Sequence, residues 1–181
     1  MTGMAGTRDP IVPDTKDWTW VLERPCPECG FEPAAQSFAD LPARIHDTAM
    51  AWSDVLARAD VGVRPEPAVW SPLEYACHVR DVHVVFAERV RLMLEVDEPA
   101  FANWDQDATA VESSYGSQDA GHVAAELIEA AGTVAGLYAT VTDATRGRRG
   151  LRSNGSVFTV ESLGSYHLHD VVHHLHDVGT G

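Results

Sequence analysis

Four stretches of the chain carry apolar residues at intervals of three and four, and this period constrains the fold more than any other feature. The first stretch runs from Ser37 to about Ala59, with apolar positions at Phe38, Leu41, Ile45, Ala49, Trp52 and Leu56. Such spacing places the apolar side chains on one face of a helix. Almost no segment alternates apolar and polar residues, as a half-buried strand would. The sequence therefore predicts an all-α protein.

The other three predicted helices have recognisable start signals. The second begins at Ser71, where the serine hydroxyl can cap the backbone amide of Glu74, and it ends near Leu94. The third and fourth are predicted over 119–142 and 159–178, and a threonine caps the last of them. Four long helices joined by loops indicate a four-helix bundle.

The N-terminal region follows a different pattern. Residues 1–36 are rich in proline and show no sustained period, so we expect an extended N-terminal arm, with the bundle formed by residues 37–181. Trp18 and Trp20 are separated by one residue and would lie on the same side of an extended segment. Because two exposed indoles are unfavourable in water, we expect this part of the arm to dock on the helices.

Charge and cysteine content narrow the class of protein. The formal net charge is −14, which repels phosphate backbones and anionic lipids, so nucleic acid and membrane surfaces are not expected partners. No apolar stretch resembles a signal peptide or a membrane span. Three cysteines are too few for a disulfide framework and agree with a reducing compartment. We expect a cytoplasmic protein that acts on a small-molecule substrate. A homodimer and a monomer are both compatible with the sequence.

Histidines are concentrated in the fourth predicted helix. Five of the nine fall within residues 167–176. His169 and His173 are one helical turn apart, a spacing that lets two imidazoles converge on one metal ion. A third ligand must come from elsewhere, and His78 on the second helix is the best placed. The alternatives are a solvated histidine pair, or His176 as the third ligand.

These residues carry a resemblance to a known family. The stretch WSPLEYACH at 70–78, followed about ninety residues later by HDVVHH at 169–174, resembles the DinB/YfiT-like family of metal-dependent enzymes. That family includes mycothiol-dependent maleylpyruvate isomerase and bacillithiol S-transferases. The resemblance covers roughly residues 37–178 and implies a four-helix bundle that binds a divalent ion such as Zn or Ni. Carried over by position, it implies His78, His169 and His173 as the metal ligands.

A site with three histidine ligands leaves coordination positions open, and an open position can lower the pKa of a bound water or thiol. The resemblance implies a thiol-dependent S-transferase or isomerase that uses mycothiol as a cosubstrate and acts on a small electrophile. The alternatives are a metal-dependent hydrolase and a non-catalytic metal-binding or ligand-binding bundle. Asp105 and Asp107, on the long loop over 99–118, are the candidate catalytic acid or base. Both could instead cap turns.

Cys26 and Cys29 form a CxxC pair in the arm. This spacing suits zinc binding or redox exchange, but a structural zinc needs two further ligands and the sequence has no second CxxC. We therefore favour a reduced structural turn over metal binding or a redox switch. Cys77, which lies about 100° around its helix from His78, is expected to be a buried core thiol.

Overall fold

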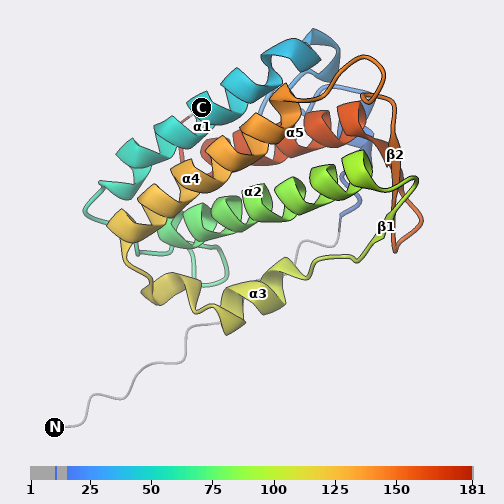
Figure 1. The fold of residues 1–181 in the computed structure, drawn as a ribbon. Helices are drawn as coiled ribbons and strands as arrows, with labels where there is room; N and C mark the ends of the chain where they lie inside the picture. Colours follow the sequence, from blue (N-terminus) through green and yellow to red (C-terminus); the bar gives the residue numbers. More distant parts are fainter. Residues whose placement is uncertain (1–10, 12–15, 181) are drawn as a thin grey trace, which may run out of the picture.

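The computed structural model describes residue 11 and residues 16–180. Within that part of the chain, four long helices pack side by side as a bundle (Figure 1), and they are α1 (Leu41–Leu56), α2 (Pro72–Glu95), α4 (Ala120–Ala139) and α5 (Val160–Asp177). The predicted all-α four-helix bundle is thus confirmed. No helix in the described ranges is both long and apolar enough to cross a membrane.

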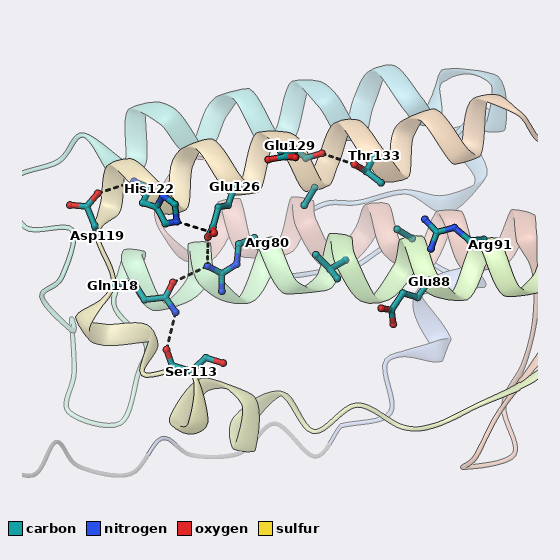
Figure 2. Close-up of a pocket in the computed structure, with 13 residues that line it drawn as sticks. Arg80, Glu88, Arg91, Ser113, Gln118, Asp119, His122, Glu126, Glu129 and Thr133 are labelled. Atoms are coloured by element: carbon teal, nitrogen blue, oxygen red, sulfur yellow. Dashed lines mark hydrogen bonds and ion pairs between the residues drawn. The ribbon is translucent and has the colours of Figure 1, made fainter.

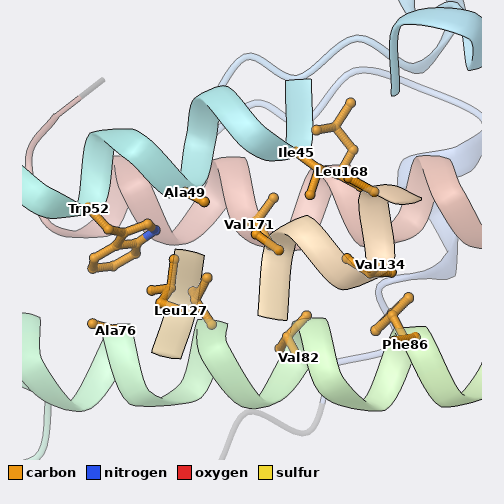
Figure 3. Close-up of a cluster of buried hydrophobic side chains, with 14 of the residues drawn as sticks. Ile45, Ala49, Trp52, Ala76, Val82, Phe86, Leu127, Val134, Leu168 and Val171 are labelled. Atoms are coloured by element: carbon orange, nitrogen blue, oxygen red, sulfur yellow. The ribbon is translucent and has the colours of Figure 1, made fainter. Parts of the chain in front are cut away.

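The core lies between the four helices and receives side chains from each of them (Figure 3). α1 contributes the largest fully buried side chain among the described residues, that of Trp52, which is 1% exposed. The other helices contribute further buried residues to this core, among them Val82, Phe86, Leu127, Val134, Leu168 and Val171. The apolar period of the sequence therefore produced the expected buried faces.

Capping boxes fix the starts of the two helices that carry the histidines. At α2, the Ser71 side chain accepts a hydrogen bond from the backbone of Glu74, and the Glu74 carboxylate accepts one from the backbone of Ser71. Arg64 donates two further hydrogen bonds to the same carboxylate. At α5, Thr159 and Ser162 form the reciprocal pair. Both predicted caps are confirmed.

Among the described residues, three short strands form a sheet at one end of the bundle, which the sequence analysis did not predict. β1 (Ala100–Phe101) pairs in parallel with β2 (Arg149–Arg152), which pairs antiparallel with β3 (Val157–Thr159). Gly150 is required at its centre, because a Cβ there would lie 2.6 Å from a ring carbon of Phe101. The sheet joins the loop after α2 to the segment that enters α5.

The rest of that loop contains α3 (Gln106–Glu112) and the 3-10 turn η4 (Tyr115–Ser117). In Figure 1, α3 lies outside the bundle, beside α2.

The described part of the arm lies against the bundle but is less extended than predicted. It contains the 3-10 turns η1 (Thr19–Leu22) and η2 (Pro33–Ala35), with η3 (Phe38–Asp40) leading into α1. η1 begins where the Asp17 carboxylate accepts hydrogen bonds from the backbone and hydroxyl of Thr19, at 2.9 and 2.8 Å. The rings of Trp18 and Trp20 still stack, 5.7 Å apart.

Candidate metal centre

α5 presents metal-ligating side chains on two edges that face different neighbours. The edge with His169 faces the arm, where the ring of Trp18 lies 5.5 Å from the imidazole. The edge with Asp170 and His174 faces α2, where the ring of His174 lies 4.8 Å from that of His78. The helix therefore divides its ligands between two groups.

The first group consists of His78, Asp170 and His174. One ligand atom from each residue lies within 4.8 Å of the others. Asp170 Oδ1 is 3.8 Å from His78 Nε2 and 3.6 Å from His174 Nε2. These separations are too long for hydrogen bonds, but two ligands that bind one ion at about 2.1 Å in tetrahedral geometry are themselves about 3.4 Å apart. The spacing fits a divalent ion between the three side chains.

Several atoms of this group are buried without a hydrogen-bond partner in the described chain. They are both ring nitrogens of His78 and Oδ1 of Asp170. His78 is only 1% exposed, and burying unpaired polar atoms is costly unless something else satisfies them. A bound cation satisfies such atoms, so the donor set fits the metal expected for this site.

The protonation states of the group also suit metal binding. Burial lowers the pKa of His78, which favours the neutral imidazole. Burial raises the pKa of Asp170, but the neighbouring His78 and His174 outweigh it and hold that pKa below its ordinary value. The group thus offers a neutral imidazole at His78 and an ionised carboxylate at Asp170, the forms that bind divalent cations.

Asp177 orients the ligand His174. The Nδ1 of His174 donates a hydrogen bond of 2.8 Å to Asp177 Oδ2, which leaves Nε2 as the nitrogen directed toward Asp170. A carboxylate behind a histidine ligand is the usual arrangement in metal sites, because it fixes the tautomer and raises the basicity of the ring.

Two tryptophans enclose His78. The ring of Trp104 lies parallel to the imidazole, 5.4 Å away, and that of Trp70 lies 5.2 Å away. Trp104 is held in place because its Nε1 donates a hydrogen bond of 2.8 Å to the Thr109 hydroxyl. The long loop therefore builds one wall of the site.

A cleft of about 820 Å³ opens over this group. Its lining comes from the arm, the segment before α2 and the start of α2, the long loop, the β2–β3 hairpin and α5. Asp170 and His174 belong to the lining together with His169 and His173, as do the predicted catalytic residues Asp105 and Asp107. Asp105 is the N-cap of α3 and accepts a hydrogen bond of 2.9 Å from the backbone of Ala108. The structure places both aspartates at the cleft, and their catalytic role stays a prediction.

The second group consists of Cys26, Cys29, His169 and His173, again with all ligand atoms within 4.8 Å of one another. Cys26 Sγ lies 3.7 Å from His173 Nδ1. All three cysteines of the chain are free thiols, and Cys77 is buried away from both groups, with its Sγ near the Tyr115 carbonyl.

The structure does not bring the three ligands predicted from the sequence into one group. His169 and His173 lie with the CxxC pair, while His78 lies with Asp170 and His174. Neither Asp170 nor His174 was among the ligands predicted from the sequence. A signal was present, because Asp170 and His174 are themselves one turn apart.

The remaining clustered histidines have other roles. His167 is buried in the core, where its Nε2 lies 3.0 Å from Nδ1 of His83 and its Nδ1 lies 3.4 Å from the Tyr138 hydroxyl. His176 is exposed.

A second hollow, of about 760 Å³, lies beside α2 and α4 (Figure 2). Its centre is occupied by Arg80, which donates hydrogen bonds to Gln118 at 2.8 Å and to Glu126 at 2.7 Å. His122 pairs with the same glutamate at 3.0 Å. Its central charges therefore neutralise one another, and neither ligand group lines it.

Comparison with known proteins assigns the fold to a family. The sequence profile of the DinB superfamily matches residues 44–178. The chain belongs to the DinB superfamily. This confirms the resemblance seen in the sequence, while the mycothiol-dependent subfamily stays a prediction.

A solved structure shares the DinB fold of this chain. It is YfiT from Bacillus subtilis, described as a probable metal-dependent hydrolase with an unusual four-helix bundle topology. The TM-score is 0.65 at 21% sequence identity, with 77% of this chain and 81% of that chain covered. No curated protein matches at a significant level. At this identity the likeness to YfiT shows a common fold.

Proposed function

We propose that this DinB-superfamily protein is a metal-dependent hydrolase whose catalytic divalent ion is held by His78, Asp170 and His174. The observation that carries the proposal is the buried group of ligand atoms, several without hydrogen-bond partners, beneath the cleft. The description of YfiT as a probable metal-dependent hydrolase supports the same reaction type. On α5, the proposal moves each expected ligand by one residue, from 169 and 173 to 170 and 174.

A group of three protein ligands leaves a coordination position for substrate, whereas four ligands close a structural site. When bound there, a divalent ion polarises a substrate carbonyl and lowers the pKa of water toward neutrality. The other contributions come from the chain itself. Trp70 and Trp104 keep bulk water away from His78, and Asp177 holds the tautomer of His174.

Asp105 and Asp107 are the candidate general bases, and both line the cleft. Asp107 lies in the first turn of α3, and the Asp105 carboxylate caps that helix. A carboxylate near the site can accept the proton of the attacking water. Replacing the general base by asparagine should therefore reduce turnover, and Asp105→Asn should in addition destabilise α3.

The charge of the cleft restricts the substrate. Among the described residues, seven acidic and two basic side chains line it: Asp17, Glu28, Glu66, Asp105, Asp107, Asp170, Asp177, Lys16 and Arg152. This excess of negative charge repels anions and attracts cations. A dianion such as maleylpyruvate is therefore disfavoured, and we propose a neutral or cationic ester or amide as the substrate.

The test is hydrolysis of a panel of neutral, cationic and anionic esters and amides by the zinc-loaded protein. We expect kcat/KM to fall by more than about 100-fold in each of three ligand variants, His78→Ala, Asp170→Asn and His174→Ala. Replacing a residue that only hydrogen-bonds to a metal ligand already lowers metal affinity or activity by about 10- to 100-fold. His176→Ala, which removes an exposed histidine from the same helix, is the matched control and should retain activity.

Two outcomes would contradict the proposal. Consumption of a thiol cosubstrate without ester or amide cleavage would favour the S-transfer expected from the resemblance. Full activity in Asp170→Asn and His174→Ala would show that the assigned ligands are not those of the catalytic ion.

A further inference from the structure

The arm and α5 together build a second ligand group that the proposed hydrolase does not use. Cys26 and Cys29 come from the arm, and His169 and His173 come from α5. Three of the four are buried, with exposures of 1% for Cys26, 3% for His169 and 7% for His173. We propose that these four side chains bind a zinc ion that fastens the arm to the bundle.

The donor set is that of a closed zinc site. Two thiolates and two imidazoles around one ion form the Cys2His2 set of structural zinc. With bonds of about 2.3 Å to sulfur and 2.05 Å to nitrogen, tetrahedral geometry separates a sulfur from a nitrogen by about 3.6 Å. Cys26 Sγ and His173 Nδ1 are 3.7 Å apart, so this pair already stands at the spacing that a shared ion requires.

The backbone of the arm presents both thiols to the helix. The Cys26 carbonyl accepts a hydrogen bond from the Gly30 amide at 2.9 Å, and the Cys26 amide donates one to the Phe31 carbonyl at 2.8 Å. Gly30 has a φ of +72°, which side-chain-bearing residues rarely adopt, and it closes the turn directly after Cys29. On the helix, the i, i+4 spacing of the histidines supplies the other two ligands.

Two further observations point to a ligand at this position. The Nε2 of His169 is buried without a hydrogen-bond partner in the described chain. Aromatic rings pack on both imidazoles, because Trp18 lies 5.0 Å from the His173 ring and Phe31 lies 5.4 Å from the His169 ring. A largely buried cluster of thiols and imidazoles at the edge of the cleft is suited to holding a cation.

The zinc ion would have a structural consequence for the cleft. The residues with which the arm lines the cleft include Lys16, Asp17, Trp18 and Glu28. Glu28 lies between the two cysteines in the sequence. Fastening the arm therefore completes one wall of the cleft. The zinc ligands differ from those of the proposed catalytic ion, so the two assignments can fail separately.

The test combines metal analysis with cobalt substitution on the full chain. Wild type is expected to hold two zinc ions per chain. The cobalt-loaded protein is expected to show thiolate-to-cobalt charge-transfer bands. The double variant Cys26→Ser with Cys29→Ser should lose one ion and all of these bands, and hydrogen exchange should accelerate over residues 18–31. Cys77→Ser, which changes the remaining thiol, should keep both ions and the bands.

The outcomes separate the two metal assignments. If wild type lacks thiolate-to-cobalt bands, or if the double cysteine variant keeps all its zinc, the inference is overturned, and this holds whether or not the variant folds normally. If wild type holds a single ion, the variants show which group binds it. Loss of that ion in His78→Ala but not in the cysteine variant overturns the zinc inference and leaves the proposed catalytic site standing. Loss of that ion in the cysteine variant but not in His78→Ala supports the zinc inference and overturns the proposed catalytic site. A Cys26–Cys29 disulfide that persists under reducing conditions would also overturn the zinc inference.

Discussion

Glu74 offers a substitution that removes a buried charge while keeping the side-chain shape. Its carboxylate accepts hydrogen bonds from the Arg64 guanidinium at 2.9 and 2.6 Å and from the Ser71 amide at 2.9 Å. Both members of the ion pair are shielded, with side-chain exposures of 15% for Arg64 and 5% for Glu74. Glu74→Gln leaves the Arg64 charge without its carboxylate at the start of α2.

The expected loss follows from this burial. Removing one member of a buried ion pair costs about 3–5 kcal/mol, and the glutamine can retain part of the hydrogen bonding at about 1 kcal/mol per bond. We therefore expect the free energy of unfolding to fall by about 2–3 kcal/mol at neutral pH.

The loss should depend on pH in a defined direction. Burial raises the pKa of Glu74, but the hydrogen bonds from Arg64 and Ser71 outweigh it and hold the pKa below its ordinary value of 4.5. A carboxyl group whose pKa is lower in the folded state stabilises the protein above the unfolded-state pKa. The difference in the free energy of unfolding between wild type and Glu74→Gln should thus have its full value above pH 4.5 and should shrink as the pH falls below 4.5.

Urea denaturation followed by circular dichroism over a pH series measures this difference. Glu95→Gln, an exposed glutamate at the other end of α2, is the matched control and should change stability by less than about 0.5 kcal/mol. A difference that stays constant as the pH falls, or a loss below about 0.5 kcal/mol at neutral pH, would refute the reasoning.

Two other predictions concern packing and thiol reactivity. Gly150→Ala should lower the free energy of unfolding by about 1–3 kcal/mol, because its Cβ would meet Phe101 at 2.6 Å. A Cβ at Gly136, in α4, would have no neighbouring atom within 4 Å, so Gly136→Ala should raise the free energy of unfolding by about 0.5–1 kcal/mol. Equal changes of the two glycine variants in thermal melts would contradict both predictions. Burial raises the pKa of Cys77 from 9.0 to about 12, so iodoacetamide should label it at least about 30-fold more slowly in the native protein than after unfolding. Rapid native labelling of Cys77, detected by mass spectrometry, would contradict its burial.

The long helices were predictable because their determinants are local. Ser71 and Thr159 cap helices through residues three positions away, and the apolar faces repeat within each segment. The small sheet was not predictable in the same way. β1 is two residues long and pairs with a strand about fifty residues later, so neither alternation nor turn residues mark it. The 3-10 turn η1 begins at Thr19, whose amide and hydroxyl donate hydrogen bonds to the Asp17 carboxylate, and this local signal did not enter the prediction of an extended arm.

The helix that carries the candidate ligands was predictable, but their grouping was not. The sequence predicts metal ligands on α5 and at His78, yet two pairs one turn apart, at 169/173 and 170/174, overlap on the same helix. Which pair meets His78 depends on how the helix is rotated against α2, and no local pattern encodes that rotation. The CxxC pair lacked visible partners for the same reason, because its neighbours are histidines on a distant helix.

The contact between Cys26 and His173 also sets the order in which the protein can be completed during synthesis. The two residues are 147 positions apart, and a ribosome adds about 5–20 residues per second, so they emerge roughly 7–30 seconds apart. Throughout that interval the arm has been made but the helix that receives it has not. The arm leaves the ribosome before α5 and is therefore among the last of the described segments to reach its native position, so docking of the arm marks the moment at which α5 has joined the bundle.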